Sequence, residues 1–313
     1  MKSSISVCIP TYQRPEFLKE ALCSVMEQTL QPIEIVIGDD SYDHETEKLV
    51  LDIKKECKIP IFYTRHSPSL RQADNINYIY KMAKGEKIVL LHDDDLLLPT
   101  ALEDLYSCWN LHPDLTAAYG NQYFISEEGD IDFNLSSNLN QMYFRINDRA
   151  GLQKSSIESA VLHQFPNDGF MIIAAAAKSI KWRSYAEVGN GGEFDFSLRL
   201  SFEYKNFFFI DKHTAKCRVT NDSMSKSSND DSAFQTFFLI LNTDFPEELI
   251  RAKEHELKRE APYAIIQLIN FNKKKQALDI YLSKYYPLPK RISLKGIRRL
   301  LKILLPISIG KLI

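Results

Sequence analysis

The chain has 313 residues, of which 44% are hydrophobic and 26% charged, and its formal net charge at pH 7 is -2. This composition is that of an ordinary folded protein with ample material for a core, and it excludes an intrinsically disordered chain. A net charge so close to zero also argues against attraction of the whole protein to nucleic acid.

The spacing of the cysteines and the length of the apolar runs indicate the cellular compartment in which the protein is expected. No CxxC or Cys/His ligand spacing occurs among the five cysteines, which are Cys8, Cys23, Cys57, Cys108 and Cys217. We expect reduced thiols in a cytosolic protein. The N-terminus lacks the basic-then-apolar order of a secretory signal, and no apolar run approaches the length needed to span a bilayer.

The first third of the chain alternates between short apolar runs and segments with apolar residues at helical spacing. The predicted strands are 5–9, 33–37, 61–63 and 88–91. Three helices are predicted between them. The first covers 14–29, the second is capped by Asp43 and contains Ile53, and the third covers 73–83. This β-α-β-α order predicts an α/β fold with a mostly parallel sheet and right-handed crossovers.

The rest of the chain has a looser pattern. Residues 115–124 and 170–177 have the composition of strands, 193–202 of a helix, and 206–219 of a pair of strands. From about Ser232 onward only helical patterns remain, so we expect a boundary near residue 230.

Three consecutive carboxylates, Asp93, Asp94 and Asp95, stand between two apolar runs in "KIVLLHDDDLLLP". A desolvated, unpaired carboxylate costs several kcal/mol, so such a triplet must face water, pair with cations or hold a metal. It also falls beyond the carboxyl end of a predicted strand, where ligands bind in open α/β sheets. The alternative is a solvated turn that begins the helix after Pro99.

Polar residues also follow the first two predicted strands. The first strand ends in "PTYQR", which contains Thr11 and Arg14, and the second in "GDD", which contains Asp39 and Asp40. Carboxylates accept hydrogen bonds from a base or a ribose, and arginine neutralises phosphate, so these residues suit a nucleotide. The alternative is that they form ordinary turns.

Together these segments resemble family 2 glycosyltransferases, which have the GT-A fold. The resemblance rests on "SVCIPTYQRPEFLKEALCSV", "EIVIGDDSYDHET" and "AKGEKIVLLHDDDLLLP". Their order and spacing are more specific than a single DxD motif, and the likeness extends to about residue 225. It implies a catalytic domain over 1–230, with a nucleotide-binding half at 1–98 and an acceptor half at 99–230. A helical region then covers 231–313.

The resemblance also implies which residues bind the donor nucleotide, usually a uridine nucleotide, with thymidine or another nucleotide left open. In "HSPSLRQADNIN", Arg71 and Asn75 occupy positions that match residues of the family that help bind the base or the ribose. The glycine that is common in this segment of the family is missing. The residues that the resemblance assigns to the nucleotide are Pro10, Thr11, Tyr12, Arg14, Asp39, Asp40, Arg71 and Asn75.

For the acidic triplet the resemblance implies a bound Mn²⁺ or Mg²⁺, which offsets the charge of the departing diphosphate. Asp94 is the first candidate ligand. Asp95 orients the ribose or a metal-bound water, and Asp93 serves in either role. His92 occupies the place where many relatives have the first aspartate of the motif.

A catalytic base is expected in "VGNGGEFDFSLRL". By resemblance Glu193 falls on the position of the catalytic aspartate, and Asp195 is the second candidate. Glycines directly before them permit close approach of a substrate. The alternative is that both carboxylates stabilise a helix N-terminus.

The segment "CRVTNDSMSKS" resembles a loop that closes over the diphosphate. Arg218, Ser223 and Ser225 are its candidate donor contacts. Many relatives have a metal-binding histidine where this chain has Thr220 or Asn221. The alternative is a polar surface loop.

Residues 290–313 contain seven basic side chains and no acidic one. Helical spacing separates a basic face from an apolar face, and Pro306 argues against a membrane span. The apolar face consists of Leu294, Ile297, Leu301, Leu304 and Leu305, and the basic face of Lys295, Arg298, Arg299 and Lys302. This pattern favours the surface of an anionic bilayer. The alternative is packing on the catalytic domain or on another subunit.

We therefore expect an inverting, metal-dependent glycosyltransferase that moves a sugar from a nucleotide diphosphate, expected to be UDP, to a hydroxyl of a glycan or lipid-linked glycan. It is expected in the cytoplasm, peripheral to the inner face of the membrane. The alternatives are a catalytically silent nucleotide-sugar binder or membrane scaffold, and a sugar nucleotidyltransferase. Nucleotidyltransferases usually have a glycine-rich, basic phosphate-binding loop near the N-terminus, and "IPTYQRPEF" is not such a loop.

Overall fold

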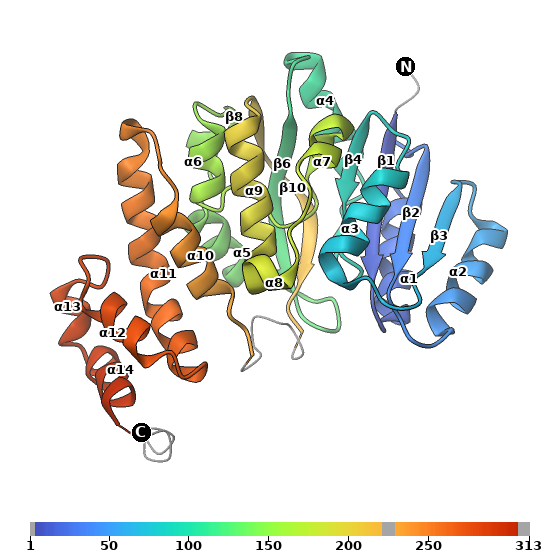
Figure 1. Ribbon diagram of the computed structural model, residues 1–313. Coiled ribbons are helices and arrows are strands. Elements are labelled where there is room, and N and C mark those ends of the chain that lie inside the picture. The colour runs from blue at the N-terminus through green and yellow to red at the C-terminus, as the bar shows by residue number, and fades with distance from the viewer. Residues whose placement is uncertain (1–3, 221–228, 306–313) are drawn as a thin grey trace. The chain divides into compact units, whose positions relative to one another are not determined.

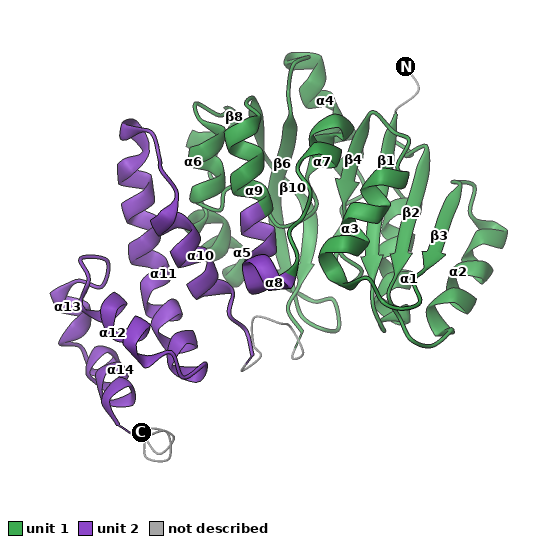
Figure 2. Cartoon of the chain, viewed as in Figure 1, with its two compact units in different colours: residues 1–184, 196–220 green, residues 185–195, 221–313 purple. Residues whose placement is uncertain are grey.

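The computed structural model describes residues 4–220 and 229–305 (Figure 1). The chain forms two compact units, drawn in green and purple in Figure 2. We call residues 1–184 and 196–220 the sheet unit, and residues 185–195 and 221–313 the helical unit. The predicted domain boundaries at 98 and 230 stay a prediction.

The described residues of the sheet unit form a ten-stranded sheet with the order β3-β2-β1-β4-β9-β6-β10-β5, in which β7 also pairs with β6 and β8 with β10. The strands are β1 (Ile5–Thr11), β2 (Glu34–Asp39), β3 (Ile61–Arg65), β4 (Lys87–Leu90), β5 (Leu96–Leu97), β6 (Ala117–Ile125), β7 (Ile131–Asp132), β8 (Gly151–Leu152), β9 (Met171–Ile173) and β10 (Phe207–Arg218). β3, β2, β1 and β4 are parallel to one another, and β6 is parallel to β10. β9 lies between β4 and β6 and is antiparallel to both. The predicted α/β fold with a mostly parallel central sheet is confirmed.

Helices cover both faces of this sheet. The helices are α1 (Pro15–Met26), α2 (Glu45–Glu56), α3 (Arg71–Met82), α4 (Ala101–Leu111), α5 (Phe133–Met142), α6 (Ser156–Val161), α7 (Ala174–Ser179) and α9 (Gly192–Glu203), with a 3₁₀ turn at Asn147–Arg149. One core contains side chains of α1, α2 and α4, and a second contains side chains of α3, α7 and α9. Every residue of β2 is buried, as expected for a parallel strand covered on both faces.

The strand register brings the predicted polar residues to one edge of the sheet. Thr11 at the end of β1 is paired with Asp39 at the end of β2. Leu91, just after β4, donates its backbone N–H to the carbonyl of Cys8 at 3.0 Å. The three strands therefore end side by side, and the acidic segment begins at that edge.

Two elements of the sheet unit differ from the expected ones. The strand expected over 170–177 ends at Ile173, and the alanines after it form helix α7, because alanine has the highest helix propensity. The strand pair expected over 206–219 is the single strand β10. Its register against β6 shifts on both sides of His213, and such irregularities bend a strand without ending it.

The helical unit contains α8 (Tyr185–Val188), α10 (Ser232–Asn242), α11 (Ile250–Asn270), α12 (Lys274–Leu282), α13 (Leu288–Arg291) and α14 (Leu294–Leu304), with 3₁₀ turns at Gly189–Gly191 and Glu247–Leu249. Phe237, Leu257 and Ile280 are buried in it. The expected C-terminal helical extension is confirmed. Within residues 4–220 and 229–305, none of the helices has the length and apolar character that crossing a membrane requires.

Candidate active site

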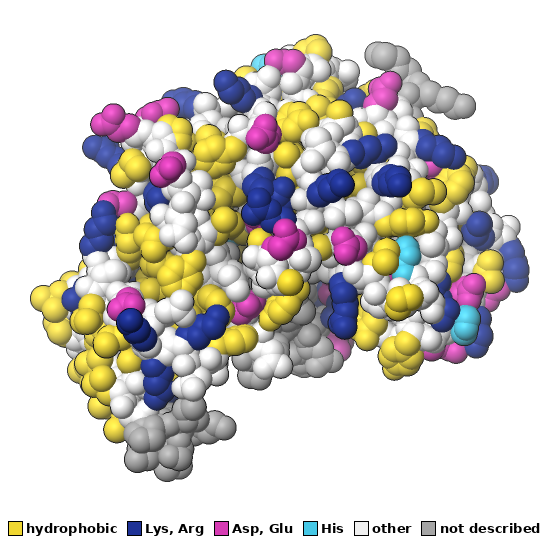
Figure 3. All heavy atoms as spheres, viewed as in Figure 1, with side chains coloured by type: hydrophobic (Ala, Val, Ile, Leu, Met, Phe, Trp, Pro, Cys, Tyr) yellow, Lys and Arg dark blue, Asp and Glu magenta, His cyan; other side chains and the backbone are white. Residues whose placement is uncertain are grey.

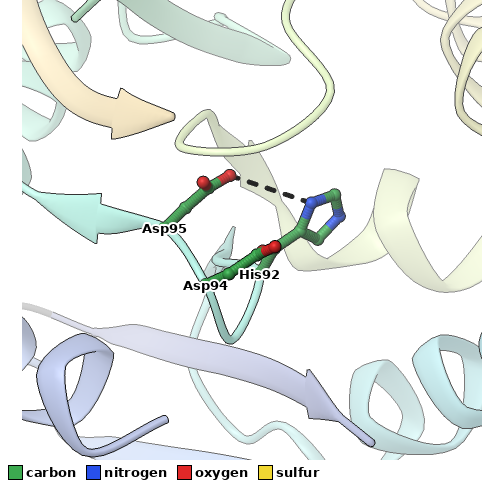
Figure 4. A group of neighbouring side chains, drawn as sticks. All are labelled: His92, Asp94 and Asp95. Atoms are coloured by element: carbon green, nitrogen blue, oxygen red, sulfur yellow. Dashed lines mark ion pairs between the residues drawn. The ribbon is translucent and has the colours of Figure 1, made fainter. Parts of the chain in front are cut away.

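The acidic turn, residues 92–95, connects β4 to β5 at the carboxyl edge of the sheet. Three of its side chains, His92, Asp94 and Asp95, bring one ligand atom each within 4.8 Å of one another. His92 Nδ1 lies 3.9 Å from Asp95 Oδ2. A dashed line marks this pair in Figure 4. The group includes two of the three predicted metal ligands and adds the histidine that replaces the first aspartate of the family motif.

Asp93 has a different position in the acidic turn. Its Oδ2 accepts hydrogen bonds from the Thr11 hydroxyl at 2.7 Å and from the Tyr12 backbone N–H at 3.2 Å. Burial, followed by the charge of Asp94, raises the pKa of Asp93 to about 6. These contacts attach the acidic turn to the end of β1.

Arg14 neutralises part of the charge of the turn. Its Nη1 lies 2.6 Å from Asp94 Oδ2 and 3.8 Å from Asp93 Oδ1. The Arg14 side chain is 33% exposed and that of Asp94 17%, so the pair lies at the surface of the site and is open to exchange with a charged ligand.

Asp95 accepts a hydrogen bond from β10 and lies near a second buried carboxylate, that of Asp168. Its Oδ1 accepts the backbone N–H of Arg218 at 2.7 Å. Asp168, in the turn before β9, accepts the backbone N–H of His92 at 3.2 Å. Burial raises the pKa of Asp95 well above its ordinary value, and the charges of Asp168 and Asp94 raise it further.

Sequence reasoning missed Asp168. Its only signal is an Asp-Gly pair ahead of an apolar run, and such pairs usually mark ordinary turns.

The Arg218 side chain supports the backbone around the acidic turn. It donates to the carbonyl of Asp94 at 2.9 Å, to that of Glu127 at 2.6 Å, and to Glu20 Oε2 at 2.5 Å. Its side chain is 1% exposed. These contacts make it a support of the turn, and its expected role facing the donor stays a prediction.

The predicted nucleotide residues at the end of β2 lie beside β1 and are themselves held in place. Asp39 accepts a hydrogen bond from the Tyr63 hydroxyl at 2.6 Å, and Asp40 accepts the Leu70 backbone N–H at 2.9 Å. Asn75 donates to the Gly38 carbonyl at 2.8 Å beneath the strand. Both aspartates therefore have fixed orientations before any ligand binds.

The remaining predicted donor residues differ in exposure. Pro10 lies within β1, and Tyr12, two residues further on, is 55% exposed beside the acidic turn. Arg71 is exposed at the start of α3 with a φ of 70°. Ser223 and Ser225 lie outside the described residues.

A family model decides the identification. The model of glycosyl transferase family 2 matches residues 6–166, just over half of the chain, including β1, β2 and the acidic turn. The chain belongs to this family.

Two curated relatives show how far the likeness to this family extends. The abequosyltransferase RfbV of Salmonella typhimurium is 24% identical over 307 residues, which cover 90% of this chain and 88% of that protein. An uncharacterized glycosyltransferase of Methanocaldococcus jannaschii is 28% identical over 132 residues, which cover 42% of this chain and 45% of that protein. The chain thus spans less than half of the length of this second relative.

Solved structures share the fold of this family 2 chain. TarS of S. aureus in complex with UDP-GlcNAc has a TM-score of 0.61 at 18% identity, with 95% of this chain and 89% of that chain covered. The mannosyltransferase PcManGT of Pyrobaculum calidifontis in complex with GDP-Man and Mn²⁺ has a TM-score of 0.60 at 14% identity, with coverages of 97% and 88%.

The donor atoms in the acidic turn of this family 2 chain suit a divalent cation. Carboxylate oxygens are ligands for Mg²⁺ and Mn²⁺, and an imidazole shifts the preference toward a transition metal. His92, Asp94 and Asp95 therefore offer a set of ligand atoms that fits a divalent cation.

The two candidates for the catalytic base lie in the first turn of α9, within the helical unit. Asp195 is fully buried and Glu193 is half-buried. Just before them, Gly189 has a φ of 57°, and a Cβ there would lie 2.4 Å from Asp231 Oδ2. Glycine is therefore required at position 189 for packing against Asp231, and the expected close approach of a substrate stays a prediction.

Proposed function

We propose that the protein is a metal-dependent, inverting glycosyltransferase that transfers a sugar from a nucleotide diphosphate donor to a hydroxyl of a glycan or lipid-linked glycan. One observation carries this proposal. The acidic turn, with metal-type donor atoms, lies at the same sheet edge as Thr11 and Asp39, where an open α/β sheet binds ligands.

The donor is proposed to be a UDP-sugar. Asp39 supports this assignment, because a fixed carboxylate accepts hydrogen bonds from a base N–H or a ribose hydroxyl. Structural neighbours were solved with UDP-GlcNAc or with GDP-Man and Mn²⁺, which supports a nucleotide diphosphate sugar as the donor class.

Asp94, Asp95 and His92 would hold the cation. When bound, a divalent cation stabilises the charge that develops on the departing diphosphate. Arg14 pairs with Asp94 and is positioned to exchange that carboxylate for a phosphate oxygen. Arg218 and Thr11 keep the acidic turn in place during this exchange.

Glu193 is proposed to take the proton of the acceptor hydroxyl, which then attacks the anomeric carbon from the face opposite the leaving nucleotide. A single displacement of this kind inverts the configuration of that carbon. The half-buried position of Glu193 supports its choice over the fully buried Asp195, because a base must reach the substrate.

A lipid-linked acceptor and a peripheral location at the cytoplasmic face of the membrane belong to the same proposal. A relative from Campylobacter jejuni, 30% identical over 101 residues, is a GalNAc(5)-diNAcBac-PP-undecaprenol beta-1,3-glucosyltransferase. The basic C-terminal segment agrees with an acceptor held at a membrane.

The decisive experiment measures nucleoside diphosphate release from a panel of nucleotide sugars with Mn²⁺ and a hydroxyl acceptor. Glu193→Gln should lower turnover by about 10² to 10⁴-fold, the usual contribution of a general base. Glu203→Gln, on an exposed residue of the same helix, should leave turnover unchanged.

The product is also examined by NMR, and the account requires an anomeric configuration opposite to that of the donor. A retained configuration or near-normal turnover of Glu193→Gln would contradict the mechanism. Donor binding without any transfer would instead favour a silent nucleotide-sugar binder.

A further inference from the structure

The C-terminal helices expose a continuous set of apolar side chains. Within residues 288–304, six of them are 39–89% exposed, and we call them the apolar strip: Leu288, Ile292, Leu294, Ile297, Leu301 and Leu304. In Figure 3, hydrophobic side chains gather over α13 and α14, with lysine and arginine side chains beside them. A helix of a globular protein normally turns its apolar face to the core, so this exposure calls for a partner.

The orientation of α14 is set by a different face of the helix. Gly296 and Ile303, seven residues apart, are buried within the helical unit. A Cβ at Gly296 would lie 2.0 Å from the carbonyl oxygen of Lys290, so glycine is required for the close crossing of α13 and α14. Ser293 caps the helix by accepting the Gly296 N–H at 3.1 Å. The apolar strip is therefore outward-facing because the helix is anchored by its other side.

Basic residues border the apolar strip. Lys295 and Arg298 are exposed and Lys302 is half-exposed on α14. Two further arginines form hydrogen bonds within the helical unit. Arg299 donates to the Tyr286 hydroxyl at 3.0 Å, and Arg291 donates to the Ser283 carbonyl at 2.6 Å. The sequence contains no acidic residue after Asp279. The surface around the strip thus has positive charge without local neutralisation by carboxylates of the same segment.

We propose that the apolar strip docks on an anionic lipid bilayer. The apolar side chains enter the boundary between headgroups and acyl chains, while Lys295, Arg298 and Lys302 lie at the level of the lipid phosphates. A second copy of the chain suits this surface less well, because a two-fold contact through the strip would bring like charges together. This inference rests on the membrane location in the proposed function and names the surface and the lipid charge that account for it, but it does not depend on catalysis.

The test is sedimentation of the full-length protein with phosphatidylcholine vesicles that do or do not contain phosphatidylglycerol. The wild-type protein should bind only the anionic vesicles. The variant Ile297→Asp/Leu301→Asp should bind them at least about tenfold more weakly, because two apolar side chains that enter the bilayer in the bound state are replaced by carboxylates. Ile250→Asp/Ile266→Asp is the matched control, since both residues are 41% exposed on α11, and it should bind like the wild type.

A second pair of variants tests the charge. Lys295→Glu/Arg298→Glu should bind at least about 25-fold more weakly, since each basic residue near an anionic surface contributes about fivefold in affinity. Lys54→Glu/Lys58→Glu changes the net charge by the same amount at two exposed lysines of the sheet unit. If the basic residues beside the apolar strip determine vesicle affinity, this variant should bind within about twofold of the wild type.

Three results would overturn the proposal. They are no sedimentation of the wild type with anionic vesicles, equal binding of Ile297→Asp/Leu301→Asp and its control, and a lipid-free dimer that those two substitutions convert to a monomer. Because no donor or acceptor is present in the assay, these results are independent of whether the protein transfers a sugar.

Discussion

At the scale of single residues, the acidic turn is neutralised and fixed by its own neighbours. The Thr11 hydroxyl holds Asp93, the Arg14 guanidinium pairs with Asp94, and the Arg218 backbone holds Asp95. A carboxylate taken out of water without such partners costs several kcal/mol. The geometry of the turn is thus prepared before a cation and a donor arrive.

This arrangement predicts a pH dependence of stability for the metal-free protein. Burial and the charge of Asp94 raise the pKa of Asp93 from 3.8 to about 6. Between these values the folded protein binds more protons than the unfolded chain, so the free energy of unfolding falls as the pH rises through that window. The loss attributable to Asp93 is on the order of 1–3 kcal/mol.

Urea denaturation from about pH 4 to about pH 6, the window set by that shift, tests this prediction. The free energy of unfolding of Asp93→Asn should depend less on pH than that of the wild type, because the substituted side chain does not ionise. Parallel profiles of the two proteins would show that Asp93 does not titrate in this range.

The candidate site was predictable from sequence where residues follow a strand. Asp39, Asp94 and Thr11 were identified in this way, since parallel strands end at one edge. Asp168 and the internal contacts of Arg218 were not predictable, because they depend on long-range packing between β9, β10 and the acidic turn.

At the scale of elements, periodic patterns predicted the strands and helices up to β4. A prediction of secondary structure was wrong where two sequence patterns favoured different elements. In residues 170–177 an apolar run suggested a strand, whereas the alanine run favoured a helix after Ile173. For the apolar face of α14 the sequence left packing on the protein as an alternative to an exposed surface, because hydrophobic periodicity does not say which apolar residues a neighbouring helix covers.

The α13–α14 contact yields a prediction at this scale. Gly296→Ala places a Cβ where the carbonyl oxygens of Lys290 and Arg291 lie, and the overpacking should lower the stability of this region by about 1–3 kcal/mol. Hydrogen exchange of α14 amides should accelerate accordingly.

Lys295→Ala is the control, because Lys295 is exposed on the same helix and alanine is a good helix former. Its exchange rates should match those of the wild type. If Gly296→Ala also exchanged at wild-type rates, α14 would not cross α13 as closely as described.

At the scale of the whole molecule, the chain keeps the family 2 fold at low sequence identity. TarS matches 95% of it at 18% identity, so the sheet and its edge are retained although most side chains differ. At this identity the likeness is one of fold.

The measurement that tests the central claim most directly is calorimetric titration of UDP into the protein with Mn²⁺ and with EDTA. We predict binding that requires Mn²⁺, and a loss of at least about tenfold in affinity for Asp94→Ala, since a charge-assisted contact is worth at least about 1.4 kcal/mol. Asp52→Ala, at an exposed carboxylate of α2, should bind like the wild type. Equal UDP affinity in EDTA, or wild-type affinity for Asp94→Ala, would contradict the claim that the acidic turn holds the donor through a cation.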